Sequence, residues 1–202
     1  MASIKRKHPF RISFNAPAVL TFVIACVLVQ LISLLTGGGS NRLLFSVYRA
    51  SLLDPLTYLR LFGHVFGHGG WEHLLNNMMF LLILGPMIEE KYGTSNVIAI
   101  MVITAFVTGV IVMIFLPGTA LLGASGIVFA FILLSSITSF EEGAIPLTFI
   151  LVAVLYIGRE IWSGVTAQDN ISQLAHIAGG VVGSALGFLM NRWHMTQAHY
   201  RR

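Results

Sequence analysis

The chain has 202 residues, of which 56% are hydrophobic and only 10% are charged. A soluble globular domain usually carries about 25% charged residues, so the composition excludes a soluble domain and indicates an integral membrane protein. The net charge of +4 comes mainly from basic residues near the two chain ends. Beside apolar spans, such clusters are typical of orientation signals, so we expect no nucleic-acid partner.

The first apolar run, residues 19–35, contains the only cysteine, Cys26. A single cysteine excludes an intramolecular disulfide and a cysteine-based metal site. The run follows a basic start, as a signal peptide would, but it lacks a good small-residue cleavage site and is close to spanning length. We therefore predict that it is a transmembrane helix.

Six apolar segments approach the roughly 20 residues that a membrane-spanning helix needs. In chain order they are residues 19–35, 73–88, 97–116, 121–140, 147–162 and 171–190. Turn signals separate them, namely the glycines at 37–39, the charged 89–91 with Gly93, Pro117-Gly118, and residues 141–143 with Pro146. The sequence therefore predicts an all-α, polytopic bundle of six transmembrane helices.

An even number of spans places both chain ends on the same side of the membrane. The segment at 1–18 and the tail at 191–202 are both basic, and the positive-inside tendency then puts both in the cytoplasm. The second, fourth and sixth spans consequently begin at the outer face.

The one long connection, residues 37–72, lies on the outer face by this parity. Large apolar residues alternate in it with Arg42, Arg49, Asp54 and Arg60. This mixture is typical of short amphipathic segments in the lipid headgroup region, so we predict an interfacial loop.

Polar side chains occur near the outer starts of the three inward-running spans. Ser125 is expected about one turn inside the fourth, Asn77 one turn inside the second with His73 at i−4, and His176 one turn inside the sixth. Parity places all four at a common depth. Polar groups in lipid are costly and usually face a cavity, and a hydroxyl, an imidazole and an amide are what acyl transfer requires.

Small residues predict that the fourth and sixth spans cross closely. Gly179, Gly183 and Gly187 follow His176 at four-residue spacing, and glycines so spaced let two helices approach. The matching small surface near Ser125 consists of Gly123, Ala124, Gly126 and Ala130. We therefore expect the Ser125 hydroxyl and the His176 imidazole to lie at hydrogen-bond distance, roughly 3 Å.

Other interpretations of these residues remain open. Ser125 can be a packing residue, and Asn77 or His176 can simply hydrogen-bond a neighbouring helix. A histidine metal site built from His64, His68, His73 and His176 is a further alternative, since His64 and His68 are i and i+4. A proton-coupled or metal transporter would need a carboxylate at mid-membrane, and the spans offer none.

Three motifs resemble those of the rhomboid family of intramembrane serine proteases. Residues 123–126, Gly-Ala-Ser-Gly, are similar to its Gly-x-Ser-Gly nucleophile motif, and His73-x-x-x-Asn77 matches its His-x-x-x-Asn. Residues 175–183 are similar to its Ala-His-x-x-Gly-x-x-x-Gly base motif. His64 and His68 stand where the family often has upstream histidines. Phe129 stands where bacterial members commonly have a tyrosine under the base.

The resemblance implies a catalytic domain at 19–190 in a bacterial inner membrane that hydrolyses peptide bonds in or beside transmembrane segments of other proteins. Ser125 would be the nucleophile and His176 the general base, without metal or cofactor. Asn77, His73 and Gly123 would support the oxyanion, and Phe129 would support the base. The alternative is a non-catalytic rhomboid-like protein that binds membrane helices. The oligomeric state does not follow from the sequence.

Overall fold

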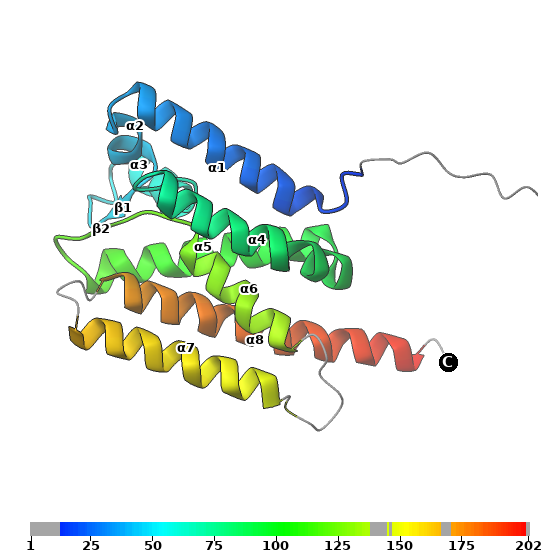
Figure 1. The fold of residues 1–202 in the computed structure, drawn as a ribbon. Coiled ribbons are helices and arrows are strands. Elements are labelled where there is room, and N and C mark those ends of the chain that lie inside the picture. Colours follow the sequence, from blue (N-terminus) through cyan, green and yellow to red (C-terminus); the bar gives the residue numbers. More distant parts are fainter. Residues whose placement is uncertain (1–12, 138–144, 146, 167–170, 201–202) are drawn as a thin grey trace, which may run out of the picture.

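The structure is a computed structural model that describes residues 13–137, 145, 147–166 and 171–200. Several features used above lie outside these residues: most of the basic segment at 1–18, the last two residues of the basic tail, the end of the fourth predicted span at 138–140, and the break at 141–143 with Pro146. Apart from one short two-stranded sheet, the regular secondary structure of the described chain is helical, so the prediction of an all-α fold is confirmed (Figure 1).

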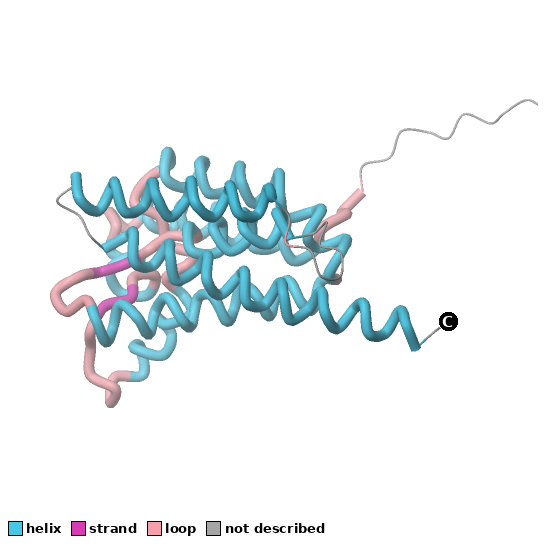
Figure 2. Tube along the Cα trace, turned by 90° about the horizontal axis from the view of Figure 1, so that it is seen from below, coloured by secondary structure: helices cyan, strands magenta, loops and turns pink. Residues whose placement is uncertain are grey.

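A helix covers most of each of the six predicted apolar segments. These helices are α1 (Pro17–Leu35), α4 (Trp71–Tyr92), α5 (Thr94–Phe115), α6 (Ser125–Ile137), α7 (Leu147–Thr166) and α8 (Ile171–Tyr200). Figures 1 and 2 show them running roughly parallel in one bundle. Among the described residues, α1 and α5 are long and apolar enough to cross a membrane, and the apolar stretches in α6 and at 176–190 are shorter.

The connection between α1 and α4 is an ordered substructure. It contains α2 (Gly39–Leu44), β1 (Val47–Tyr48) and α3 (Pro55–Gly63). Strand β1 pairs antiparallel with β2 (Ala120–Leu121), the segment just before α6. Figure 2 shows both strands at one end of the bundle. The predicted interfacial loop is therefore hydrogen-bonded to the segment that leads into α6.

Arg60 organises the polar contacts inside this connection. Its guanidinium pairs with Asp54 at 3.1 Å, donates to the Leu43 carbonyl at 2.8 Å and lies over the Tyr48 ring at 4.7 Å. The Asp54 carboxylate also caps α3 by accepting from the Leu56 N–H at 3.0 Å. The loop is consequently fixed by hydrogen bonds and not by apolar packing alone.

Helix α6 begins later than predicted. The apolar run was expected to be helical from residue 121, but Leu121 is in strand β2 and the helix starts at Ser125. Gly123 has a φ of +127°, which turns the chain out of the strand and which residues with a side chain rarely adopt. Ser125 therefore lies at the first position of α6, one turn closer to the helix end than expected.

Glu89, near the end of α4, connects that helix to the first residues of α1 and α5. Its carboxylate is buried and accepts from the backbone N–H groups of Ala18 at 2.9 Å and Val19 at 3.1 Å in the first turn of α1. It also accepts from the Thr94 hydroxyl at 2.8 Å at the start of α5. A helix leaves its first N–H groups without internal partners, so a carboxylate from α4 completes α1.

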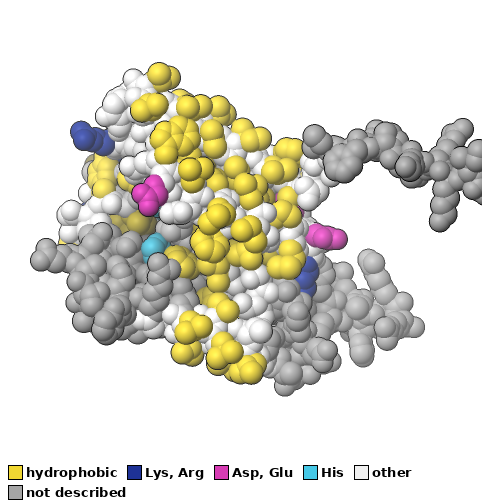
Figure 3. All heavy atoms as spheres, viewed as in Figure 1, with side chains coloured by type: hydrophobic (Ala, Val, Ile, Leu, Met, Phe, Trp, Pro, Cys, Tyr) yellow, Lys and Arg dark blue, Asp and Glu magenta, His cyan; other side chains and the backbone are white. Residues whose placement is uncertain are grey.

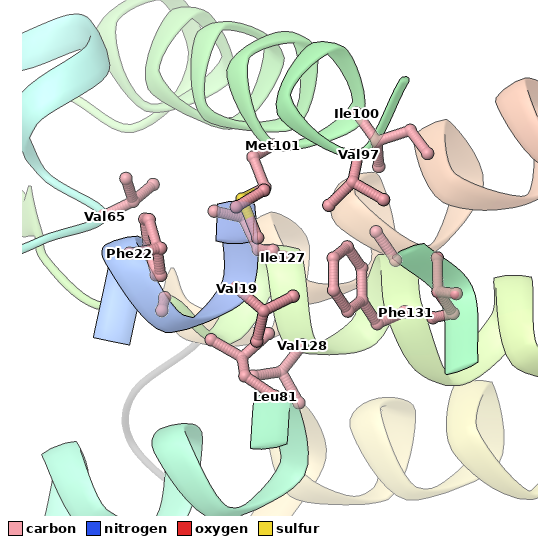
Figure 4. Packing of buried hydrophobic residues seen from close by; sticks show 14 of the residues in the cluster. Val19, Phe22, Val65, Leu81, Val97, Ile100, Met101, Ile127, Val128 and Phe131 are labelled. Atoms are coloured by element: carbon pink, nitrogen blue, oxygen red, sulfur yellow. The ribbon is translucent and has the colours of Figure 1, made fainter. Parts of the chain in front are cut away.

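The apolar core lies around α6. Ile127 and Phe131 lie toward Met101 and Val97 of α5, and Val128 lies toward Leu81 of α4 and Val19 of α1 (Figure 4). On α4, Gly85 lies directly against Val19 of α1, because a β-carbon there would come within 2.6 Å of the valine side chain. Residues of α1, α4 and α5 thus form one apolar cluster with the buried residues of α6 and fix the position of that helix.

The outward surface of the long helices is strongly apolar. Large side chains such as Leu35, Leu155 and Ile83 are 85%, 72% and 65% exposed. In Figure 3 hydrophobic side chains cover the middle of the visible face, and charged side chains lie toward its two ends. A soluble monomer rarely exposes so large a continuous apolar surface, whereas a lipid-facing bundle requires it.

Candidate active site

The segment before Ser125 is held by the connection between α1 and α4. The Gly123 N–H donates to the His64 carbonyl at 2.9 Å, and the Ala124 N–H donates to Nε2 of His68 at 3.4 Å. Both histidines precede α4, and both bonds fix backbone that leads directly into α6. The position of the serine is therefore set from outside its own helix.

His73 and Asn77 lie against the same segment from α4. A β-carbon on Gly123 would come within 2.8 Å of Cε1 and 2.9 Å of Nε2 of His73, and within 3.8 Å of Nδ2 of Asn77. Only a glycine leaves room for the imidazole here. The structure thus brings together three of the predicted oxyanion residues beside the residue that begins α6.

His73 and Asn77 each offer a hydrogen-bond donor beside Gly123. The Gly69 N–H donates to Nδ1 of His73 at 3.4 Å, so a neutral His73 carries its proton on Nε2, the atom next to Gly123. Asn77 is 6% exposed, and among the described residues its Nδ2 has no hydrogen-bond partner. A buried donor without a partner costs about 1–3 kcal/mol, which is expected at a site that binds developing negative charge.

Gly123 contributes space and not a donor. Its N–H is engaged by the His64 carbonyl and that of Ala124 by His68, whereas the N–H of Ser125 belongs to the first turn of α6. The first N–H groups of a helix have no internal partner, and the helix dipole favours negative charge there.

His176 lies half-buried on α8, with its ring against Phe129 of α6 at 4.6 Å between centroids and 49° between planes. Phe129 follows Ser125 by one helical turn. The structure therefore places His176, the predicted base, in ring contact with Phe129, its predicted aromatic support.

The close crossing of the fourth and sixth segments is confirmed. A β-carbon on Gly179 would overlap the carbonyl of Gly126 and come within 2.7 Å of its Cα, and one on Gly183 would come within 2.6 Å of the Ala130 Cβ. Helices α6 and α8 also make the most extensive contact of any helix pair described. The two backbones touch along the glycine face that follows His176.

The histidines considered for a metal site are engaged by the protein. Nδ1 of His64 lies 3.1 Å from the Leu61 carbonyl and 3.2 Å from the Arg60 carbonyl, and its Nε2 lies 3.3 Å from the Thr108 hydroxyl. Within the described part of the chain, no three side chains of the metal-binding types gather.

Burial keeps these two loop histidines neutral. Desolvation lowers the pKa of His64 to about 4, and desolvation followed by the charge of His73 lowers the pKa of His68 to about 4. A neutral His68 can accept from Ala124 with Nε2 while Nδ1 donates to the Phe66 carbonyl at 3.2 Å. The sequence showed their i, i+4 spacing and their match to upstream histidines of the family, but neither signal indicated their contacts with the segment before the serine.

Comparison with known proteins agrees with the geometry. The family model of the Rhomboid domain matches residues 55–193. The chain is 30% identical over 196 residues to proteins named Rhomboid protease GlpG from Salmonella choleraesuis, Salmonella newport and Salmonella typhimurium, a match that covers 91% of this chain and 68% of each relative.

The chain therefore belongs to the rhomboid family, and it is an integral membrane protein.

Proposed function

We infer that the protein is an intramembrane serine endopeptidase that acts on transmembrane protein substrates. Family membership supports the activity, because the relatives it resembles over nearly the whole chain are named as proteases. The same comparisons do not favour the alternative of a non-catalytic helix-binding protein.

The observation that carries the assignment of the site is the setting of Gly123. His73 and Asn77 contact it from α4, and Ser125 begins α6 two residues later. A hydroxyl at a helix start, beside an unpaired amide donor and an imidazole N–H, is the arrangement that acyl transfer needs. Ser125 is accordingly our proposed nucleophile.

In the proposed reaction, neutral His176 accepts the Ser125 proton as Oγ attacks the scissile carbonyl. The same proton then passes to the leaving amine. In the second half, His176 takes a proton from a water that attacks the acyl-enzyme ester and returns it to Ser125 Oγ, so that the acyl product leaves as a carboxylic acid. Phe129 supports the imidazole by ring contact, as its 4.6 Å centroid distance from His176 suggests. The ring has no hydroxyl, so it can orient the base but cannot hydrogen-bond to it.

The oxyanion is proposed to bind Nδ2 of Asn77, Nε2–H of His73 and the backbone N–H of Ser125. The unpaired, buried state of the Asn77 amide supports its role, since the donor is already desolvated and aimed before substrate binds. Gly123 allows these groups to approach by presenting no side chain.

The proposed topology has six spans within a catalytic domain at 19–190. The basic segments at 1–18 and 191–202 are proposed to lie in the cytoplasm and the bundle in a bacterial inner membrane. The site then opens near the outer face, where water is available. A substrate helix must unwind there, because its backbone carbonyls are otherwise paired internally.

The direct test compares Ser125→Ala with Ser135→Ala, a serine of the same helix whose hydroxyl donates to the Ile132 carbonyl. Cleavage of a model single-span substrate in liposomes should be lost in the first variant and kept in the second. A fluorophosphonate probe should label the wild type and Ser135→Ala but not Ser125→Ala or His176→Ala. Cleavage by folded Ser125→Ala would remove this residue from the mechanism.

A further inference from the structure

An apolar cavity of about 450 Å³ lies between α1 and α5, on the underside of the connection that contains α3. Phe22 and Ala25 of α1 face Met101 and Val102 of α5 across it, and Phe62 of α3 covers one end. None of the proposed catalytic or oxyanion residues lines it. Figure 4 shows Phe22, Val65 and Met101 from its wall at the edge of the core.

The length of the cavity matches one leaflet of a bilayer. Along α5 its lining runs from Thr94 to Ala105, a rise of about 16 Å at about 1.5 Å per residue. Half of the hydrocarbon core is about 15 Å thick. The far end is closed by aromatic rings, since Phe62 stacks on Phe106 at 5.7 Å and Phe66 packs on Phe22 at 4.9 Å.

A second, polar hollow continues the cavity at its other end. The two share Pro17 and Thr94, and the second is lined by Glu89 and Glu90. Glu89 is occupied by the N–H groups of α1, but Glu90 is exposed. Within the described residues the one salt bridge joins Arg60 to Asp54, so Glu90 presents an anionic group at the mouth of the cavity.

The width of the cavity suits an acyl chain better than a whole helix. A transmembrane helix is about 10 Å across, whereas an extended hydrocarbon chain is a few ångströms wide and fits a cavity of about 450 Å³. Water is disfavoured because an apolar wall gives it no hydrogen-bond partners.

We propose that this cavity binds one acyl chain of a phospholipid with an ammonium-bearing headgroup, of the phosphatidylethanolamine type. The chain lies along α5 with its methyl end under Phe62 and Phe66, and the ammonium lies beside the Glu90 carboxylate. The site would help hold α1 and the loop connection against α5. It is independent of the proposed protease chemistry and can be tested in Ser125→Ala.

The test uses a phosphatidylethanolamine with a photoactivatable diazirine on one acyl chain, in liposomes of phosphatidylethanolamine and phosphatidylglycerol. Cross-linked peptides are mapped by mass spectrometry. We expect labelling of α1 and α5 to exceed that of α7 at least fivefold, and to be the same in Ser125→Ala. Equal labelling of all lipid-facing helices would overturn the proposal.

Two neighbouring residues of α5 give a matched pair of variants. Val102 and Ile103 are both exposed, but only Val102 lines the cavity. Val102→Trp should reduce the labelling of α1 and α5 at least fivefold, and Ile103→Trp should leave it unchanged. Ala25→Phe fills the cavity from α1 and provides a second blocking variant. Labelling that survives in both blocking variants would contradict the site.

The headgroup is tested separately with Glu90→Gln. In the wild type, the ethanolamine probe should label the cavity at least threefold more than a phosphatidylglycerol probe with the same chain, and Glu90→Gln should remove this preference. Equal labelling by both lipids in the wild type would refute the ammonium contact. A single-span substrate that cross-links to the same peptides and displaces the lipid would refute the acyl-chain assignment.

Discussion

The two parts of the proposed dyad are held by different kinds of contact. His176 is brought to α6 by the glycine contact, in which Gly179 and Gly183 of α8 touch the backbone at Gly126 and Ala130. Ser125 is fixed by the histidine contact, in which the His64 carbonyl and the His68 ring accept from Gly123 and Ala124.

The first contact depends on shape and the second on hydrogen bonds. Close backbone packing tolerates no added atom, but it is independent of pH. The histidine contact can lose a ring acceptor to protonation or substitution without a steric clash. Substitutions should therefore be able to disturb the base and the nucleophile independently of each other.

The largest effect is expected from filling the glycine contact. Gly179→Val would drive a side chain into the Gly126 backbone, which cannot move aside, so α8 should separate from α6. We expect a stability loss of about 3 kcal/mol or more and cleavage below one thousandth of wild type. The exposed Ala185→Val on the same helix is the control, measured by thermal unfolding and substrate cleavage. Wild-type stability in Gly179→Val would show that close backbone packing at this position does not hold α8 against α6.

Removing the unpaired amide should change chemistry without harming the fold. For Asn77→Ala we expect kcat to fall about one hundredfold with little change in KM, since an oxyanion donor acts in the transition state. Stability should be unchanged or higher, because a buried donor without a partner is removed. The exposed neighbour provides the control, Asn76→Ala. An effect confined to KM would argue against oxyanion binding.

Acid should weaken the histidine contact and spare the glycine contact. The folded pKa of His68 is lowered to about 4, below the unfolded value of 6.5, so the unfolded chain binds more protons between these pH values. The stability from a neutral His68 is fully present above pH 6.5 and is lost as the pH falls toward 4, on the order of 1–2 kcal/mol by pH 5.

This dependence is measured by following unfolding of the wild type and His68→Gln between pH 7 and pH 5. Glutamine keeps an acceptor for the Ala124 N–H but does not titrate. The variant should therefore lose less stability in acid than the wild type, although His64, whose pKa is also lowered to about 4, still titrates. Parallel curves for the two proteins would exclude His68 as the source.

The smallest loss of stability is expected from a change at Asp54, which precedes α3 in the connection between α1 and α4. Asp54→Asn should keep the cap on α3, because asparagine also accepts from the Leu56 N–H, and should lose only the part-exposed ion pair with Arg60. We expect less than about 1 kcal/mol and nearly full activity. Asp54→Ala removes the cap as well and should cost about 1 kcal/mol more in unfolding measurements. Equal losses in both variants would assign the effect to the charge.

The sequence predicted the helices well because apolar runs are long and their breaks are chemically distinct. It also predicted the contact between α6 and α8, since glycine spacing directly reports close approach. The start of α6 was missed because Leu121 is equally apolar in a helix and in a strand. Only its pairing with Val47 of the distant β1 decides between them.

The roles of His64, His68 and Glu89 could not be predicted. Each depends on a partner far along the chain: Gly123, Ala124 and the first turn of α1. The pattern of apolar residues predicts helices, but it does not predict which distant backbone group a polar side chain will hydrogen-bond. In the sequence Glu89 belongs to a charged break at the end of the second span, whereas in the structure its carboxylate is buried within the fold.

The Glu89 carboxylate also bears on how the chain is made. The N–H groups it binds belong to residues 18 and 19, which leave the ribosome some seventy residues earlier. The first turn of α1 therefore acquires this acceptor only after the end of α4 has been synthesised. The contact that joins the start of α1 to the end of α4 consequently forms late relative to the synthesis of α1 itself.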